Sequence, residues 1–145
     1  MKNFVVFIAI CCIIGLSESI SKEQRMEMFV KVAKECAEEE GASAVDVDEL
    51  VAHKSASEKG GKCIRACLAE TVGMIKDQVD IEGVSNLAAM AFDGNPTKIQ
   101  VAKNLANECA DITDPDRCEA AAKIMECGQN AAKSRGLNFE DLNNN

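Results

Sequence analysis

The feature that most constrains the fold is a pair of cysteines separated by three residues, Cys63 and Cys67. On an α-helix these residues lie one turn apart on nearly the same face. Consecutive turns of a helix hold the two Cβ atoms too far apart for a disulfide bond, so each cysteine must bond to a different partner. The helix that carries the pair is therefore expected to be tied to two other parts of the chain.

The first nineteen residues have the features of a secretory signal peptide. Lys2 gives the positive start, positions 4–16 form an apolar run, and positions 17–19 offer a small-x-small cleavage site. A second such site lies two residues further on, so the mature chain begins at either residue 20 or residue 22. The apolar run is too short for a helix that spans a bilayer. We therefore expect a secreted, extracellular protein without stable membrane association.

Removal of residues 1–19 takes Cys11 and Cys12 with it and leaves six of the eight cysteines. An even number of cysteines in a secreted chain of about 126 residues predicts a disulfide framework within one domain. The segment holds one basic and one acidic residue, so the formal net charge stays at −8. That acidic balance argues against nucleic acid and anionic membrane surfaces as partners.

The spacing of apolar residues predicts an all-α fold of six helices, and no stretch alternates with the period of two that a strand requires. Asn95-Pro96 has the form of a cap followed by proline at the first helical position. A loop is expected over 55–61. The first expected helix covers 22–40, with a capping box at Ser21 and Gln24 and an end at Gly41, and the second covers about 46–53. The third helix carries the cysteine pair, and the fourth follows a cap at Asp80. The fifth helix begins at Asn95-Pro96, and the sixth begins at Asp114-Pro115 and ends near Arg135.

Geometry reduces the possible disulfide pairings without deciding between them. Cys118 and Cys127 are nine residues apart on one expected helix and point to opposite faces, so they do not bond to each other. Six cysteines allow fifteen pairings. Three of these pairings join Cys63 to Cys67, and three join Cys118 to Cys127. One pairing contains both bonds, so five pairings are excluded and ten remain open.

The complete spacing, Cys36-x26-Cys63-x3-Cys67-x41-Cys109-x8-Cys118-x8-Cys127, resembles that of the insect odorant-binding proteins of the pheromone-binding and general-odorant-binding (PBP/GOBP) family. The resemblance covers the whole mature chain. It implies a compact six-helix domain over 20–145, stapled by three interlocked disulfides around an apolar cavity. The implied disulfides are Cys36–Cys67, Cys63–Cys118 and Cys109–Cys127. A saposin-like protein would begin with a different close pair of cysteines, and a small secreted phospholipase would need a His-Asp pair, which His53 does not form.

The implied function is that of a secreted carrier, which binds small hydrophobic molecules such as odorants or pheromones and transports them through sensillar lymph or another body fluid. Delivery to a membrane olfactory receptor would be indirect, and we expect a monomer or weak homodimer. The alternative is a non-olfactory secreted protein that acts in protein interaction or as a carrier in haemolymph, saliva or reproductive fluid.

The composition supports a cavity without aromatic anchors. The mature chain has three phenylalanines and neither tryptophan nor tyrosine, so covalent ties can hold open a hollow that large side chains do not fill. We expect one largely aliphatic ligand with a single polar group. Methionines 26, 28, 74, 90 and 125 would make the lining adaptable. The candidate lining residues are Phe29, Val32, Leu68, Val72, Ile75, Leu87, Met90, Ala91, Val101, Leu105, Ile124, Leu137, Phe139 and Leu142.

The tail over 137–145 is expected either to fold back as a partial lid or to fray. In parts of the family, acid releases the ligand through the C-terminal segment or through histidines. Here the chain has a single histidine, His53, which makes a histidine switch the weaker possibility. The alternative is a lid that moves when the carboxylates of Glu140 and Asp141 are protonated.

Catalysis and metal binding are not expected. The sequence offers no nucleophile paired with a base, because it has one histidine and its mature cysteines are expected to be in disulfides. Positions 46–49 and 111–114 are acidic but lack the glycine and terminal glutamate of a calcium loop. No catalytic residue, metal site or cofactor is predicted.

Overall fold

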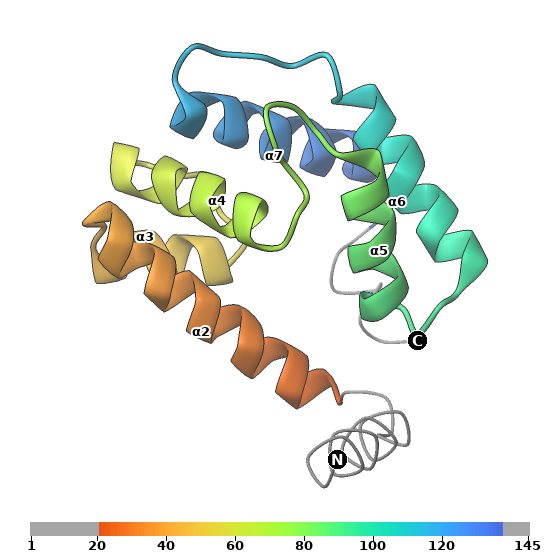
Figure 1. Cartoon of the computed structure of the whole chain (residues 1–145), viewed down its shortest axis with the longest axis horizontal. Coiled ribbons are helices and arrows are strands. Elements are labelled where there is room, and N and C mark those ends of the chain that lie inside the picture. Colours follow the sequence, from red (N-terminus) through yellow and green to blue (C-terminus); the bar gives the residue numbers. More distant parts are fainter. Residues whose placement is uncertain (1–20, 138–145) are drawn as a thin grey trace, which may run out of the picture.

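The computed structural model describes residues 21–137, which form six α-helices and no β-strand (Figure 1). The predicted all-α fold is thereby confirmed. The proposed signal peptide and the tail residues Phe139 and Leu142 lie outside the described residues. Within the described span, no helix is both long enough and apolar enough to cross a bilayer. The helices are α2 (Lys22–Glu40), α3 (Ala44–Val51), α4 (Lys59–Thr71), α5 (Ile81–Ala91), α6 (Pro96–Glu108) and α7 (Arg117–Ser134).

Local capping explains the helix boundaries that the sequence predicts correctly. The Ser21 hydroxyl accepts a hydrogen bond from the Gln24 backbone at 3.2 Å, and the Gln24 side chain accepts one from the Ser21 backbone at 3.0 Å. These two bonds form the predicted capping box. Gly41, with φ of 64°, ends α2. The Asp80 and Asn95 side chains cap α5 and α6 as predicted.

The second helix begins two residues before its predicted start at Asp46. Ser43 is the cap, and its hydroxyl accepts a hydrogen bond from the Asp46 backbone at 3.3 Å. The Asp46 carboxylate in turn accepts one from the Ser43 backbone at 2.8 Å. Asp46 therefore closes a capping box at the third helical position instead of opening the helix.

Helix α4 also begins earlier than predicted, because it includes Gly60 and Gly61 from the expected loop. A Cβ atom at Gly60 would lie 2.7 Å from the Asp46 carboxylate and 3.2 Å from the Ala42 side chain. The start of α4 thus packs so closely against Ala42 and Asp46 that a larger residue at position 60 would have to displace the Asp46 carboxylate. This tertiary contact outweighs the weak helix propensity of glycine.

Helix α7 begins later than the predicted start at Asp114-Pro115. The cap is Asp116, whose carboxylate accepts a hydrogen bond from the Cys118 backbone at 2.8 Å. Asp114 accepts one from the Asp116 backbone at 2.9 Å and forms an ion pair with Lys123 at 2.6 Å. Asp114 therefore stabilises the turn before the helix.

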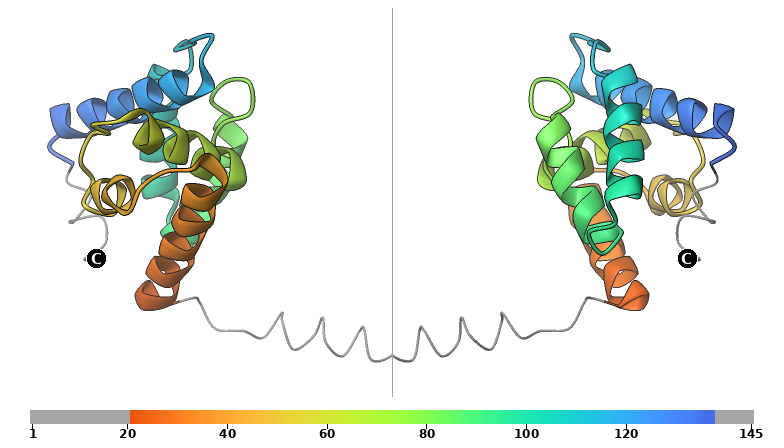
Figure 2. Two further views of the ribbon diagram at one scale, coloured as in Figure 1. Left: turned by 90° about the vertical axis from the view of Figure 1, so that its left-hand side faces the viewer. Right: turned by 90° about the vertical axis from the view of Figure 1, so that its right-hand side faces the viewer.

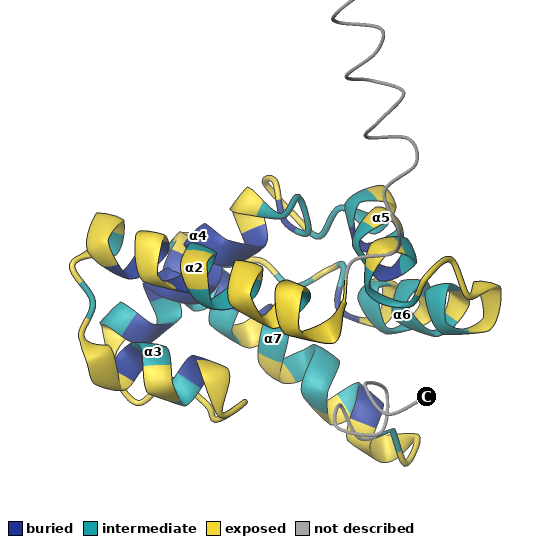
Figure 3. Ribbon diagram, turned by 90° about the horizontal axis from the view of Figure 1, so that it is seen from below, coloured by how far each residue is buried: buried dark blue, intermediate teal, exposed yellow. Residues whose placement is uncertain are grey.

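Helix α4 occupies the middle of the molecule. It packs most extensively against α7 and also contacts α2 and α3, while α5 and α6 lie side by side and α6 contacts α7 (Figures 1 and 2). Eight of the thirteen residues of α4 are buried, whereas the outer face of α2 is exposed (Figure 3). Two hydrophobic clusters result, one between α4 and α2–α3 and the other between α4, α7 and the segment after α4.

Three disulfides connect these helices. Cys36–Cys67 joins α2 to α4, Cys63–Cys118 joins α4 to α7, and Cys109–Cys127 joins the residue after α6 to α7. Their sulfur–sulfur distances are 1.98, 2.08 and 2.04 Å. These are the same three pairs that the family resemblance implies, out of the ten that helix geometry leaves open.

Candidate ligand cavity

A cavity of about 320 Å³ lies between the two hydrophobic clusters. Its apolar lining comes from α2, α3, α4, α5, α6, α7 and the segment between α4 and α5. The lining residues are Phe29, Leu50, His53, Lys54, Arg65, Leu68, Ala69, Met74, Ile75, Val79, Val84, Ala102, Leu105, Ala106, Cys109, Ile124, Met125, Gly128 and Gln129.

Two helices form continuous walls because their lining residues repeat at helical spacing. On α6 and the residue after it, the stripe is Ala102, Leu105, Ala106 and Cys109, and on α7 it is Ile124, Met125, Gly128 and Gln129. An added Cβ at Gly128 would meet no atom within 4 Å. Gly128 lies one turn after Ile124 on the same face, so the space beside it belongs to the cavity.

The segment between α4 and α5 supplies a third wall through Met74, Ile75 and Val79. It turns back on itself, since the Asp80 backbone donates a hydrogen bond to the Met74 carbonyl at 2.9 Å and Ile75 pairs with Val79 as an antiparallel bridge. This closure holds three apolar side chains against the cavity.

A close contact between two glycines sets the position of α5. Gly73, with φ of 77°, follows α4, and its carbonyl oxygen would lie only 1.7 Å from a Cβ atom at Gly83. Any side chain at Gly83 would therefore push α5 away from the end of α4. Val84 is the next residue of α5 and lines the cavity.

The polar lining residues are His53, Lys54, Arg65 and Gln129. His53 and Lys54 are exposed and mark the place where the cavity meets solvent. Arg65 is only 4% exposed. Its guanidinium donates hydrogen bonds to the carbonyl oxygens of Gly61, at 2.7 Å, and of Lys54. This charged group is thus held in the wall of a mostly apolar hollow, beside the backbone of Lys54.

The structure brings five of the predicted lining residues together: Phe29, Leu68, Ile75, Leu105 and Ile124. Of the five methionines expected to make the lining adaptable, Met74 and Met125 line the cavity. Met26, Met28 and Met90 are 49%, 52% and 61% exposed. Phe139 and Leu142 remain outside the described residues.

Seven predicted lining residues do not reach the cavity: Val32, Val72, Leu87, Met90, Ala91, Val101 and Leu137. Val32 and Val72 pack against the cluster between α4 and α2–α3. On α5, the inward face consists of Val84 and Ala88, so Met90 points outward. Val101 lies about 100° around α6 from Ala102 and is half-buried at the flank of the wall. Leu87, Ala91 and Leu137 are half-buried away from the cavity.

Some of the missed residues carried a usable signal. Ala102 and Ala106 share the inner stripe of their helix with Leu105 and Cys109, and small residues on such a stripe leave room for a ligand. Arg65 and Gly128 carried none, because their position in a helix does not reveal that one is buried and the other faces empty space.

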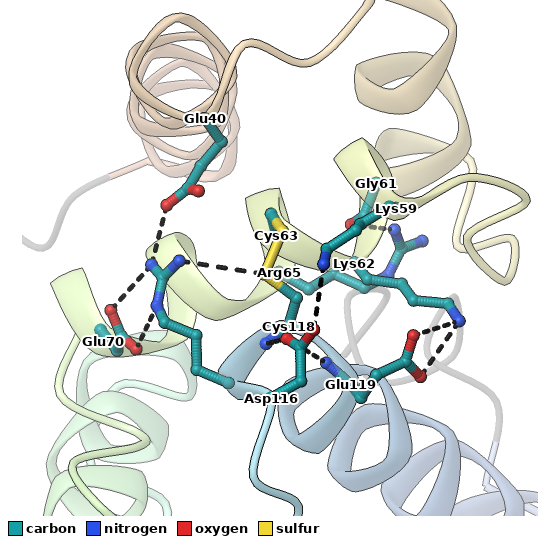
Figure 4. The surroundings of a disulfide bond; sticks show 11 residues. Glu40, Lys59, Gly61, Lys62, Cys63, Arg65, Glu70, Asp116, Cys118 and Glu119 are labelled. Atoms are coloured by element: carbon teal, nitrogen blue, oxygen red, sulfur yellow. Dashed lines mark hydrogen bonds and ion pairs between the residues drawn. A yellow bond between two sulfur atoms is a disulfide. The ribbon is translucent and has the colours of Figure 1, made fainter.

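Ion pairs surround the Cys63–Cys118 disulfide and join α4 and α2 to α7 (Figure 4). Lys62 contacts Glu119 at 2.8 Å and Lys59 contacts Asp116 at 3.1 Å. Arg117 contacts Glu40 at 2.7 Å and Glu70 at 3.2 Å. These two carboxylates raise the pKa of the Arg117 guanidinium. The cluster of Glu40 with Cys63 and Cys118 offers no thiolate to a metal, since both sulfurs are in the disulfide.

Comparisons with known proteins agree with this architecture. The model of the PBP/GOBP family matches residues 18–131. General odorant-binding protein 28a of Drosophila melanogaster is 30% identical over 142 residues, which cover 94% of this chain and 99% of that protein. General odorant-binding protein 19d of the same species is 25% identical over 140 residues, which cover 94% and 93%.

Two solved structures share the fold. Odorant-binding protein dmelOBP28a from Drosophila melanogaster matches with a TM-score of 0.68 and 33% identity, covering 81% of this chain and 100% of that chain. Fatty acid binding protein OBP56a from the oral disk of the blowfly Phormia regina matches with a TM-score of 0.62 and 26% identity, covering 81% and 99%.

Proposed function

The chain belongs to the PBP/GOBP family of odorant-binding proteins, which are carriers of small hydrophobic ligands, and from this premise we propose how its own cavity is used. The cavity takes one largely aliphatic molecule, with the chain of the ligand among the apolar walls and its polar group beside His53, Lys54 and Arg65. The observation that carries this proposal is an apolar hollow whose walls are joined by disulfides.

The volume of the cavity sets the size of the ligand. About 320 Å³ is roughly twice the ~150 Å³ of an apolar cavity that accepts benzene, which gives room for about a dozen carbon atoms. Burying such a chain contributes about 10 kcal/mol, at about 0.8 kcal/mol for each methylene group. Lost translational and rotational freedom offsets about 4 kcal/mol or more. The difference of about 6 kcal/mol corresponds to dissociation constants of tens of micromolar or weaker.

The ligand belongs to the same broad class as that in the name of the blowfly relative, which is a fatty acid binding protein. We extend the proposal to the setting of the protein: it is secreted after removal of residues 1–19 or 1–21 and acts in an extracellular fluid as a monomer or weak homodimer, without catalytic activity. Mass spectrometry of the protein recovered from the medium of insect cells tests these points. A mature chain beginning elsewhere than residue 20 or 22, or a stable oligomer, would contradict them.

Displacement of an environment-sensitive fluorescent probe tests the use of the cavity. Gly128→Leu places four additional carbon atoms in the open space beside Gly128, and we expect it to weaken binding of twelve-carbon alcohols and aldehydes at least tenfold without loss of stability. Asn130→Leu is the matched control, because it adds a leucine on the same helix at an exposed position that does not line the cavity. Equal affinity in the two variants would refute binding at this site.

A further inference from the structure

Arg65 is an unusual residue for the wall of an apolar cavity. It lies in the middle of α4, the most buried helix, and is 4% exposed. Placing a charge in such surroundings is costly unless other groups compensate for it. The hydrogen-bond partners of Arg65 therefore indicate whether its charge only stabilises the fold or is also available to a ligand.

The fold engages only part of the guanidinium. Two hydrogen bonds go to the carbonyl oxygens of Gly61 and Lys54, whereas a guanidinium has five N–H groups. Carbonyl oxygens accept hydrogen bonds but do not neutralise the charge. Among the residues that the structure describes, no carboxylate lies within 4.0 Å of the Arg65 nitrogens.

Two carboxylates, Asp46 and Glu49, act on the charge of Arg65 from beyond 4.0 Å, and each accepts its direct hydrogen bonds from a serine instead. Asp46 accepts hydrogen bonds from Ser43 at 2.8 and 2.9 Å, and Glu49 accepts them from Ser57 at 2.6 and 3.0 Å. Burial lowers the pKa of the Arg65 guanidinium, while Glu49 and Asp46 act in the opposite direction. Because arginine stays protonated in proteins, the cavity keeps a positive group with N–H donors to spare.

We propose that Arg65 is the head-group residue of the cavity and selects ligands that end in a carboxylate, with the aliphatic chain extending among the apolar walls. A ligand carboxylate would contact the guanidinium directly, which neither Asp46 nor Glu49 does, and would accept charge-assisted hydrogen bonds, which are roughly twice as strong as neutral ones. Lys54 lies at the exposed rim beside it and adds a second positive charge. The net charge of −8 opposes an anion only weakly, since salt screens exposed charges beyond about 8–10 Å.

This inference rests on the proposed function, because it requires that the cavity holds an aliphatic ligand. The competing explanation is that Arg65 only ties the segment before α4 to the helix through the Lys54 and Gly61 carbonyls. The two explanations differ in whether the chemistry of the ligand's head group matters.

The experiment compares ligands of one chain length that differ only in their head group. Dodecanoic acid, dodecanol and methyl dodecanoate displace a fluorescent probe from the protein secreted from the full-length sequence, with disulfides intact, at pH 7. We expect the acid to bind about tenfold more tightly than the alcohol or the ester. Equal affinity of all three in the unaltered protein overturns the inference but leaves the proposed function standing. Failure of all three to bind overturns the proposed function itself.

Variants then assign the preference to Arg65. Arg65→Met should bring the affinity for the acid down to that for the alcohol in the same variant, whereas Arg65→Lys should retain part of the preference. A parallel loss of acid and alcohol binding would identify a structural role only. If Arg65→Met does not fold, the comparison is made in Arg65→Lys, where an undiminished preference for the acid would contradict the assignment to Arg65. Lys54→Gln is the matched comparison, and loss of the whole preference in that variant would assign it to Lys54 instead.

Discussion

Gly83→Ala tests whether the glycine contact at the end of α4 positions one wall of the cavity. The new methyl group would stand 1.7 Å from the Gly73 carbonyl oxygen and 2.8 Å from the carbonyl carbon, both of which are backbone atoms. Real Cβ atoms do not approach such atoms closer than 3.0 Å, so α5 and Gly73 must separate by about 1.3 Å.

The expected cost is the sum of three effects. Overpacking of this kind destabilises a protein by about 1–3 kcal/mol. The displacement also weakens the hydrogen bond from the Gly83 backbone to the Asp80 cap, now 3.1 Å, and losing a cap costs about 1 kcal/mol. The better helix propensity of alanine offsets about 1 kcal/mol. We therefore expect a net loss of about 1–3 kcal/mol, and weaker ligand binding because Val84 moves with α5.

Gly128→Ala is the matched control. Its added Cβ meets no atom within 4 Å and its backbone lies within α7, so it should stabilise the protein by about 0.5–1 kcal/mol. Urea unfolding followed by circular dichroism, with disulfides intact, gives both free energies. If Gly83→Ala proves as stable as Gly128→Ala, the contact with Gly73 does not position α5 and the explanation of this wall is wrong.

Two further predictions concern stability. Asp46→Asn should cost about 1–3 kcal/mol at pH 7, since the buried carboxylate accepts two hydrogen bonds from Ser43. The Ser43 backbone N–H lowers the pKa of Asp46 in the folded state, so this stabilisation is present above the unfolded pKa of about 3.9 and is lost as pH falls through the folded value. Urea unfolding should therefore give a smaller difference in unfolding free energy between Asp46→Asn and the unaltered protein at pH 2 than at pH 7. An unchanged difference would contradict the assignment. Replacing Cys63 and Cys118 together by alanine should cost about 4 kcal/mol for a separation of 55 residues, against about 3 kcal/mol for Cys109 and Cys127 with a separation of 18. Thermal unfolding of the two double variants checks this order, and the reverse order would indicate that local packing outweighs the loop-length effect.

The sequence predicts those parts of the fold that short-range interactions control. The capping box at Ser21 and the caps at Asp80 and Asn95 involve residues within three positions of one another, so the boundaries of α2, α5 and α6 follow from local chemistry. The predicted boundaries differ from the structure where a distant contact intervenes. The start of α4 shows this, because Gly60 and Gly61 become helical when they pack against Ala42 and Asp46.

The lining of the cavity likewise contains residues that the sequence predicts and residues that it does not. Helical periodicity identifies Phe29, Leu68, Ile75, Leu105 and Ile124 as inward-facing, but periodicity cannot say where along an inward face a side chain meets a neighbour and where it meets empty space. The sequence predicts Leu87 and Ala91 as lining residues, whereas α5 brings Val84 to the cavity. The difference arises from the Gly73–Gly83 contact, which sets how α5 crosses the end of α4.

The sequence alone therefore determined the helical class, the three disulfides that the described residues form and the apolar character of the interior, because composition, local spacing and the resemblance of the cysteine spacing to that of the PBP/GOBP family are enough for these. Only the tertiary structure decided which side chains bound the hollow and that Arg65 lies in its wall. Burial of Arg65 depends on the segment around Lys54, which precedes α4 and accepts a hydrogen bond from Arg65, and such burial is a property of several segments together.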